Sequence, residues 1–152
     1  MTHNPLAASP AFKGKSQNGL YGDATEELDW SMGVLLETLK EEGLDQNTLV
    51  IFTSDNGADE HFGGTNRPLR GQKGTTYEGG FRVPCIMRWP AKIPAGQETD
   101  NLVTSMDFLP TLAHYCGYAV PSDRVIDGHN VSGILEGESM ASPTETFYYY
   151  QK

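Results

Sequence analysis

The stretch that decides the fold is TLVIFTSDNG, residues 48–57. Its first half, Leu49 to Phe52, is a short continuous apolar run, which is typical of a strand buried on both faces. Its second half turns polar at Ser54. Ligands of open α/β sheets bind beyond the carboxyl ends of the strands, so we expect Asp55 and Asn56 to lie where a binding site would form.

A helical pattern precedes this strand. Apolar residues recur at helical intervals between Leu28 and Leu39, Asp23 could cap the helix with Glu26 three residues on, and Gly43 could end it. A helix followed by a buried strand indicates an α/β architecture.

The sequence after this strand alternates between loop and regular patterns. Residues 54–80 are polar and glycine-rich, which predicts one long loop, and a loop of that length is usually functional or disordered. The remaining expected elements are a strand at 82–89 with Pro84 at its start or at a sheet edge, a short strand at 102–104, a helix at 106–115 with Pro110 in its first turn and Gly117 as its stop, and a strand that begins at 147–150.

Length and composition indicate one ordinary globular domain. The chain has 152 residues, of which 38% are hydrophobic and 20% charged. The net charge of −9 argues against nucleic acid or an anionic membrane as the main partner. No apolar run is long enough to span a bilayer, and residues 1–20 read as an extended loop without the apolar core of a signal peptide.

A basic stretch nevertheless lies inside this acidic chain. Between His61 and Gln97 the only acid is Glu78, against the cations Arg67, Arg70, Lys73, Arg82, Arg88 and Lys92. Such a stretch could hold a small anion or could be a solvated surface strand and loop. Cys85 and Cys116 have neither CxxC spacing nor a neighbouring His, so they indicate no zinc or redox site, and two buried unpaired thiols are favoured over one disulfide.

Asp55 and Asn56 offer a carboxylate and an amide oxygen, which are hard donors suited to Ca²⁺ or Mg²⁺. Asp-Asn-Gly is also a common turn, and two donors do not make a metal site. Lys73 can bring a compact cation to the same strand end. A metal ion and an ammonium group together would surround an anion.

Several of these motifs together resemble the sulfatase family of the alkaline-phosphatase-like superfamily. The resemblance covers about residues 3–117 and rests on the segments YGDATEELDWSMGVLLETLKEEGL (21–44), TLVIFTSDNG (48–57), RPLRGQKGTTYEGGFRVPCIMRWP (67–90) and SMDFLPTLAHYCG (105–117), which follow the family's order and spacing. It implies an α/β fold that forms part of an alkaline-phosphatase-like sandwich, a sheet flanked by helices, truncated at both ends.

The resemblance also implies roles for particular residues. Asp55 and Asn56 match two of the family's metal ligands, which hold a divalent cation, usually calcium (Ca²⁺). Lys73 matches the lysine that contacts a sulfate oxygen and the leaving-group oxygen. His3, in THNPL, matches the histidine that contacts the sulfate and helps to protonate the leaving alcohol. Glu78 is interpreted as structural, and the remaining histidines, His61, His114 and His129, as surface or packing residues.

One departure from the family pattern is decisive for activity. Sulfatases attack sulfur with a formylglycine made within a Cys/Ser-x-Pro-x-Arg motif, and no Cys or Ser of this chain stands in that motif. The family's other metal carboxylates would also belong to a segment preceding His3. The sequence therefore predicts a partial sulfatase catalytic domain over 1–152, with a loop at 1–20, a core at 21–117 and a tail at 118–152 that leads into a C-terminal sheet.

Three functions remain open at this point. The chain could belong to a sulfuric ester hydrolase that acts on a sulfate ester only in a complete domain, it could be a non-catalytic anion- or metal-binding module, or it could come from a phosphoester or phosphonate hydrolase of the same superfamily. Since neighbouring strands would be missing, we also expect an exposed strand edge and self-association through it.

Overall fold

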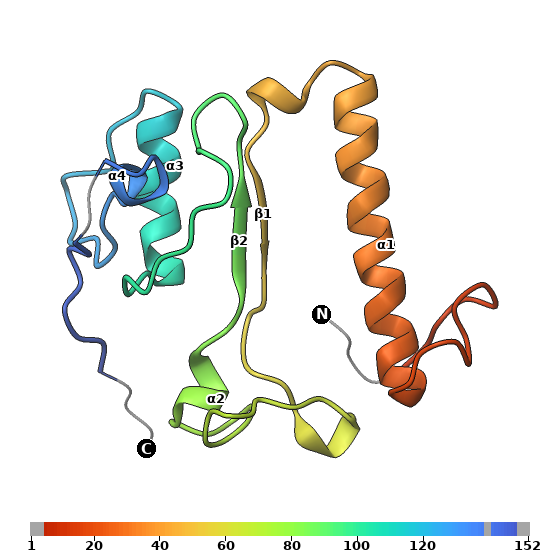
Figure 1. The fold of residues 1–152 in the computed structure, drawn as a ribbon. Coiled ribbons are helices and arrows are strands. Elements are labelled where there is room, and N and C mark those ends of the chain that lie inside the picture. Colours follow the sequence, from red (N-terminus) through yellow and green to blue (C-terminus); the bar gives the residue numbers. More distant parts are fainter. Residues whose placement is uncertain (1–4, 139–140, 149–152) are drawn as a thin grey trace. The chain divides into compact units, whose positions relative to one another are not determined.

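A computed structural model describes residues 5–138 and 141–148, in two compact units. Unit 1 contains the described residues up to Ile86, and unit 2 contains those from Met87 onward. Figure 1 shows the mixture of helices and strands that the sequence predicts, which confirms the α/β class. Within the described ranges, no helix combines the length and the hydropathy that crossing a bilayer requires.

Unit 1 begins with the long helix α1, Gly19–Glu41. Its half-buried apolar side chains form a stripe at helical spacing, made of Leu28, Met32, Leu36 and Leu39. The helix ends as predicted: Gly43 has a positive φ of 67°, and the Leu44 N–H donates back to the Leu39 carbonyl at 2.8 Å.

The start of α1 differs from the prediction. The helix begins at Gly19 with Asn18 as its N-cap residue, so Asp23 lies inside the first turns and does not cap them. Its carboxylate instead accepts hydrogen bonds from the backbone N–H groups of the preceding turn, Gly14 at 2.7 Å, Lys15 at 3.2 Å and Ser16 at 2.8 Å. A carboxylate that accepts from three backbone donors at once makes more bonds than the reciprocal pair of a capping box, and these bonds hold the turn against the helix.

The short 3-10 helix η1, Asp45–Asn47, connects α1 to the strand β1, Val50–Thr53 (Figure 1). β1 pairs with β2, Cys85–Arg88, in a two-stranded sheet. The Thr53 hydroxyl donates to the Pro84 carbonyl at 3.0 Å, and the Gly57 N–H donates to the Gly80 carbonyl at 2.9 Å. Residue numbers rise along the first segment while those of the bonded partners fall, so the pairing is antiparallel.

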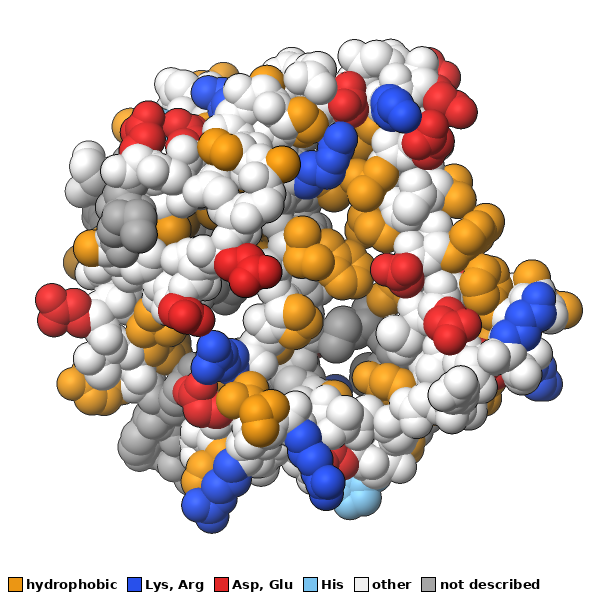
Figure 2. Space-filling model, viewed as in Figure 1, with side chains coloured by type: hydrophobic (Ala, Val, Ile, Leu, Met, Phe, Trp, Pro, Cys, Tyr) orange, Lys and Arg blue, Asp and Glu red, His pale blue; other side chains and the backbone are white. Residues whose placement is uncertain are grey.

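Burial on both faces of β1 was expected, and this expectation is wrong for the described chain. All four β1 residues are only half-buried, because β1 has a single neighbouring strand among the described residues. Large hydrophobic side chains are also exposed on α1, among them Trp30, Val34 and Leu35. Figure 2 shows hydrophobic side chains gathered along this helix. Self-association through such surfaces stays a prediction.

Unit 2 contains the 3-10 helix η3, Ser105–Asp107, which runs into α3, Phe108–Tyr115, and the short helix α4, Ser132–Leu135. Pro110 lies in the first turn of α3, and Gly117 follows with a positive φ of 74°, both as predicted. The buried apolar residues of the described chain, Trp89, Val131 and Ile134, belong to this unit. Its interior also contains Asp107, which is 1% exposed.

Three other expectations need correction. Residues 102–104 form no strand: Thr104 caps η3, and its backbone N–H donates to the Asp107 carboxylate at 2.7 Å. The expected strand at 147–150 has no regular structure at 147–148, and 149–150 lie outside the described residues. Cys85 and Cys116 are unpaired, as favoured, but exposed.

Candidate functional site

The site predicted from the sequence lies at the carboxyl end of β1, in unit 1. Ser54 is buried, and its hydroxyl donates to the Asn56 carbonyl at 2.6 Å, which fixes the turn that follows the strand. Asp55 is exposed and Asn56 half-buried. Among the described residues, neither side chain makes a hydrogen bond or ion pair that would compete with a ligand.

The turn continues into Gly57, which fits tightly against the end of the long loop at 54–80, here called the 54–80 loop. The Gly57 N–H donates to the Gly80 carbonyl at 2.9 Å. A Cβ atom at Gly57 would collide with the backbone carbonyl of Gly79, and one at Gly79 would collide with that of Gly71. Glycine is therefore required here by close backbone approach.

Lys73 is joined to this turn through the backbone. Its N–H donates to the carbonyl of Ala58 at 3.2 Å, and Ala58 is also bonded on both backbone groups by the amide side chain of Asn66, at 2.7 and 2.8 Å. Asp55 lies three residues before Ala58. The loop thus returns the predicted lysine to the segment that carries the predicted metal ligands, although they are far apart in sequence.

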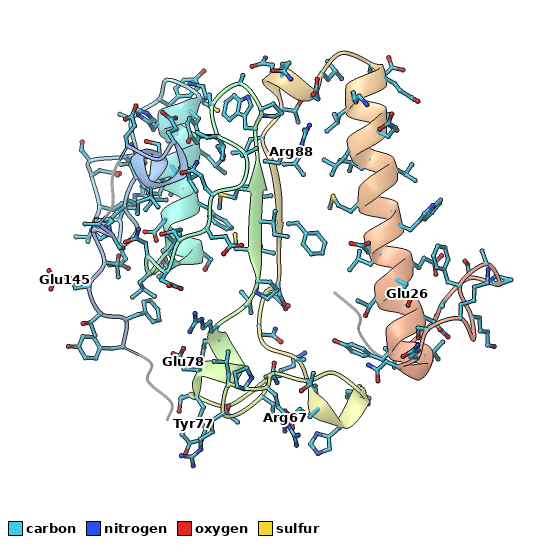
Figure 3. The ribbon with its side chains drawn as sticks, in the orientation of Figure 1. Glu26, Arg67, Tyr77, Glu78, Arg88 and Glu145 are labelled. Carbon is cyan, nitrogen blue, oxygen red and sulfur yellow. The ribbon has the colours of Figure 1, made fainter. Side chains whose placement is uncertain are left out.

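The 54–80 loop is more ordered than the sequence predicts. It contains the 3-10 helix η2, Glu60–Phe62, and its end enters the short helix α2, Glu78–Phe81. Thr75 fixes the turn at residues 72–75. Its hydroxyl donates to the Gln72 carbonyl at 2.8 Å and accepts from the Gln72 N–H at 3.1 Å. Figure 3 shows Tyr77 and Glu78 at α2 and Arg67 on the neighbouring part of the loop.

Asp59 and His61 form a polar pair in this loop. The His61 ring Nδ1 lies 2.9 Å from the Asp59 carboxylate, which also accepts from the His61 backbone N–H at 3.0 Å. These bonds from His61 lower the pKa of Asp59 below its ordinary value, and the positive charge of Lys73 lowers it further.

Sequence reasoning missed an open cavity of about 510 Å³ in the same loop. It is lined by Glu60, His61, Arg70, Gly71, Gln72, Thr75 and Tyr77. His61 was interpreted as a surface or packing residue; it is exposed, yet it contributes to this cavity. The only hint in the sequence was the basic stretch that contains Arg70.

The residues fit a divalent cation only in part. Asp55 and Asn56 are adjacent hard oxygen donors, free of competing bonds within the described chain, whereas Ca²⁺ prefers about 6 to 8 oxygen ligands. Among the described residues, no three His, Cys, Asp or Glu side chains gather where they could hold a metal ion. His3, the remaining predicted site residue, lies outside the described residues.

Comparison with known proteins gives a consistent result. The sulfatase family model matches residues 1–118. Human steryl-sulfatase is 46% identical over 97% of this chain, and dog N-acetylgalactosamine-6-sulfatase is 45% identical over 97%. The chain spans only 27% and 29% of the length of these two proteins.

Solved sulfatase structures share the fold. A sulfatase from Pseudoalteromonas matches with a TM-score of 0.80 at 37% identity, over 91% of this chain and 29% of its own. A protein solved in complex with its substrate D-glucosamine-2-N,6-O-disulfate matches with a TM-score of 0.67 at 30% identity, over 92% of this chain and 29% of its own. The motifs, the antiparallel β1–β2 pair with its glycine-rich return loop and these matches agree, and the chain belongs to the sulfatase family, with the alkaline-phosphatase-like fold.

Proposed function

We propose that this chain supplies one part of a sulfate-ester hydrolysis site. Asp55 and Asn56 would provide two ligands of a divalent cation, calcium in the first instance, and Lys73 would contact the sulfate group. The observation that carries the proposal is the bond between the Lys73 N–H and the Ala58 carbonyl at 3.2 Å. It ties the lysine segment to the turn that carries both donors.

The chemistry follows from the charge of the substrate. A sulfate ester is an anion, and negative charge grows on the bridging oxygen as its bond to sulfur breaks. When bound, the cation acts as a Lewis acid on the sulfate oxygens. The exposed ammonium group of Lys73 would neutralise the growing charge and donate a proton to the leaving oxygen. His3 would assist at the same oxygen.

The nucleophile is missing from this part of the site. No Cys/Ser-x-Pro-x-Arg motif occurs among the 152 residues, so nothing in the chain can become formylglycine. We therefore expect the chain alone to give no hydrolysis of an aryl sulfate above background. Turnover by the purified chain that disappears in Lys73→Ala would contradict this expectation.

A chimaera tests whether the chain can supply its part of a working hydrolysis site. In human steryl-sulfatase, the segment matching this chain would be replaced by the chain itself, and sulfate release measured for a nitrophenyl sulfate and for an alkyl sulfate. We expect activity in the chimaera and a loss of roughly 100- to 1000-fold in kcat for Lys73→Ala. Lys40→Ala is the matched control, because Lys40 is exposed on α1 in a surface pair with Glu37.

The two substrates separate the roles of Lys73. A nitrophenolate leaves without protonation, so its release should suffer less than that of an alcohol. If Lys73→Ala raised only KM, and equally for both substrates, Lys73 would be a ground-state binding residue and its leaving-group role would be wrong. A folded chimaera without any activity would contradict the proposed function itself.

A further inference from the structure

The cavity in the 54–80 loop has a lining of mixed charge that the proposed sulfate chemistry does not use. Its charged side chains are Glu60 and Arg70, with His61 beside them, and its one large apolar surface is the ring of Tyr77. Glu60, His61, Arg70 and Tyr77 are all exposed to solvent. The cavity is therefore open to a ligand and lined for hydrogen bonding.

Arg70 is positioned by stacking. Its guanidinium carbon lies 3.9 Å from the centroid of the Tyr77 ring, which holds the planar donor group in one orientation. A guanidinium held in this way can donate two parallel hydrogen bonds to a sulfate or carboxylate. The Arg70 backbone is also bonded, since the Gly79 N–H donates to the Arg70 carbonyl at 2.8 Å.

The lining also offers oxygen acceptors from Gln72 and Glu60. The side-chain oxygen of Gln72 accepts from the Glu60 N–H at 3.0 Å, so it fastens η2 to the lysine segment. The carboxylate of Glu60 makes no hydrogen bond or ion pair within the described residues and can accept from hydroxyl groups. A bare anion would be repelled by this carboxylate, whereas a ligand with both hydroxyl groups and an anionic group matches a lining that contains Glu60 and Arg70.

Position connects the cavity with the proposed site. Gln72 and Thr75 of the lining flank Lys73 in sequence, and His61 is bonded to Asp59, the residue after Ala58. Ala58 in turn accepts the Lys73 N–H. A substrate whose sulfate lies at Lys73 would thus have the cavity segments directly beside it.

We propose that this cavity is a subsite for a sugar ring that carries an anionic group, which makes sulfated sugars, and not sterol sulfates, the substrate class. The inference rests on the proposed function and deepens it. Sequence identity does not separate the two classes, because the steryl-sulfatase and the N-acetylgalactosamine-6-sulfatase are 46% and 45% identical to the chain. A rigid apolar sterol would bury Glu60 and Arg70 without partners, which is unfavourable.

The experiment measures binding by the full 152-residue chain and not turnover. Amide shifts are followed by NMR while D-glucosamine-2-N,6-O-disulfate, unsulfated glucosamine, inorganic sulfate and estrone sulfate are added in separate titrations. We expect saturable shifts at residues 60–61 and 70–77 with the sulfated sugar, and at least tenfold weaker binding of the other three probes. Arg70→Ala should weaken binding of the sulfated sugar by roughly 10- to 100-fold.

Arg82→Ala is the matched control, because Arg82 is an exposed arginine of the same unit that does not line the cavity. It should leave the affinity unchanged. Arg70→Lys keeps the charge but loses the planar fork, and it should bind between the wild type and Arg70→Ala. Spectra of each variant without ligand show that the fold is retained.

Three results would overturn the proposal: estrone sulfate shifting the same residues with equal or higher affinity, no saturable shift at these residues with the sulfated sugar, or equal weakening by Arg82→Ala and Arg70→Ala. Because the readout is binding, it is independent of sulfate release. Failure of the chimaera to hydrolyse any sulfate ester would contradict the proposed function and leave a measured sugar site in place.

Discussion

The 54–80 loop of unit 1 and the η3–α3 region of unit 2 each hold irregular backbone in place, but by different contacts. The loop does so through glycines in close approach, as at Gly57 and Gly79, together with backbone bonds and partly exposed polar side chains such as Asn66. The η3–α3 region does so with buried polar side chains, Asp107 and Thr111, which are 1% and 4% exposed.

The difference separates structural from functional polar groups. Asp107 accepts from the backbone N–H groups of Thr104 and His129, at 2.7 Å each, and the Thr111 hydroxyl accepts from Val131 N–H at 3.0 Å. Both side chains are engaged in hydrogen bonds inside the unit. In the loop, the bonds come from backbone groups and from the side chains of Ser54, Asn66, Gln72 and Thr75, while Asp55, Lys73 and Arg70 are exposed.

The largest expected effect comes from breaking the close approach in the loop. In Gly57→Ala the added Cβ would collide with the Gly79 carbonyl, a backbone atom that cannot move aside cheaply. We expect a loss of roughly 3 kcal/mol or more in the free energy of unfolding, at the upper end for an overpacked site. Urea denaturation followed by circular dichroism measures it.

Gly33→Ala is the control, because an added Cβ at this exposed position in the middle of α1 would meet nothing within 4 Å. It should stabilise the chain by about 0.5 to 1 kcal/mol. Equal behaviour of the two variants would show that the loop is not held by close backbone approach.

The second effect tests the buried carboxylate of unit 2. Asp107→Ala removes the capping box with Thr104 and leaves the N–H of His129 without its partner. We expect a loss of about 2 kcal/mol in the free energy of unfolding. The control Asp123→Ala removes only an exposed pair with Arg124, so a change within about 0.5 kcal/mol is expected. If Asp107→Ala left the free energy of unfolding unchanged, the stability of unit 2 would not depend on this carboxylate.

Local patterns predicted the elements that local physics determines. The apolar spacing and Gly43 predicted α1 and its end, and the apolar run predicted β1, because period and turn chemistry lie in neighbouring residues. Asp23 shows the limit. Its partners are the N–H groups of a turn seven to nine residues earlier, and no sequence pattern distinguishes that arrangement from a capping box.

The candidate site likewise has a part that the sequence could predict and a part that it could not. Its residue types could be taken from the motifs that resemble the sulfatases, and their roles stay predictions. The cavity could not be predicted, because it depends on contacts such as Gln72 with Glu60 and Arg70 with Tyr77, which arise only when the loop closes. The exposure of β1 could not be predicted from its apolar run either, since burial depends on which strands lie beside it.

A third prediction concerns acid stability in unit 1. The backbone N–H groups of Gly14 and then Ser16 hold the pKa of Asp23 below its ordinary value of 3.8. A carboxylate with a lowered pKa in the folded state stabilises fully above its ordinary pKa, and this contribution is lost as pH falls through the lowered value. The thermal midpoint should therefore fall in acid, and Asp23→Asn should flatten that part of the curve.

The matched control for acid stability is Asp29→Asn, an exposed position on the same helix. It should keep the acid slope of the wild type. Thermal scans between about pH 5 and pH 2 show the difference. If Asp23→Asn lost stability in acid as steeply as the wild type, the bonds from Gly14 and Ser16 would not be the source of the slope.

The smallest effect is expected at Glu78, which the sequence interpretation treats as structural. Its carboxylate lies 3.8 Å from Arg82 in an i, i+4 pair on α2, with both side chains about 60% exposed. Such pairs contribute about 0.3 to 0.5 kcal/mol and are screened by salt. Glu78→Gln should change the free energy of unfolding by no more than that, and the change should shrink at high salt. Because Glu78 does not line the cavity, Glu78→Gln should also leave binding of the sulfated sugar unchanged. A loss of binding without a loss of stability would show that Glu78 contacts the ligand and is not a purely structural residue.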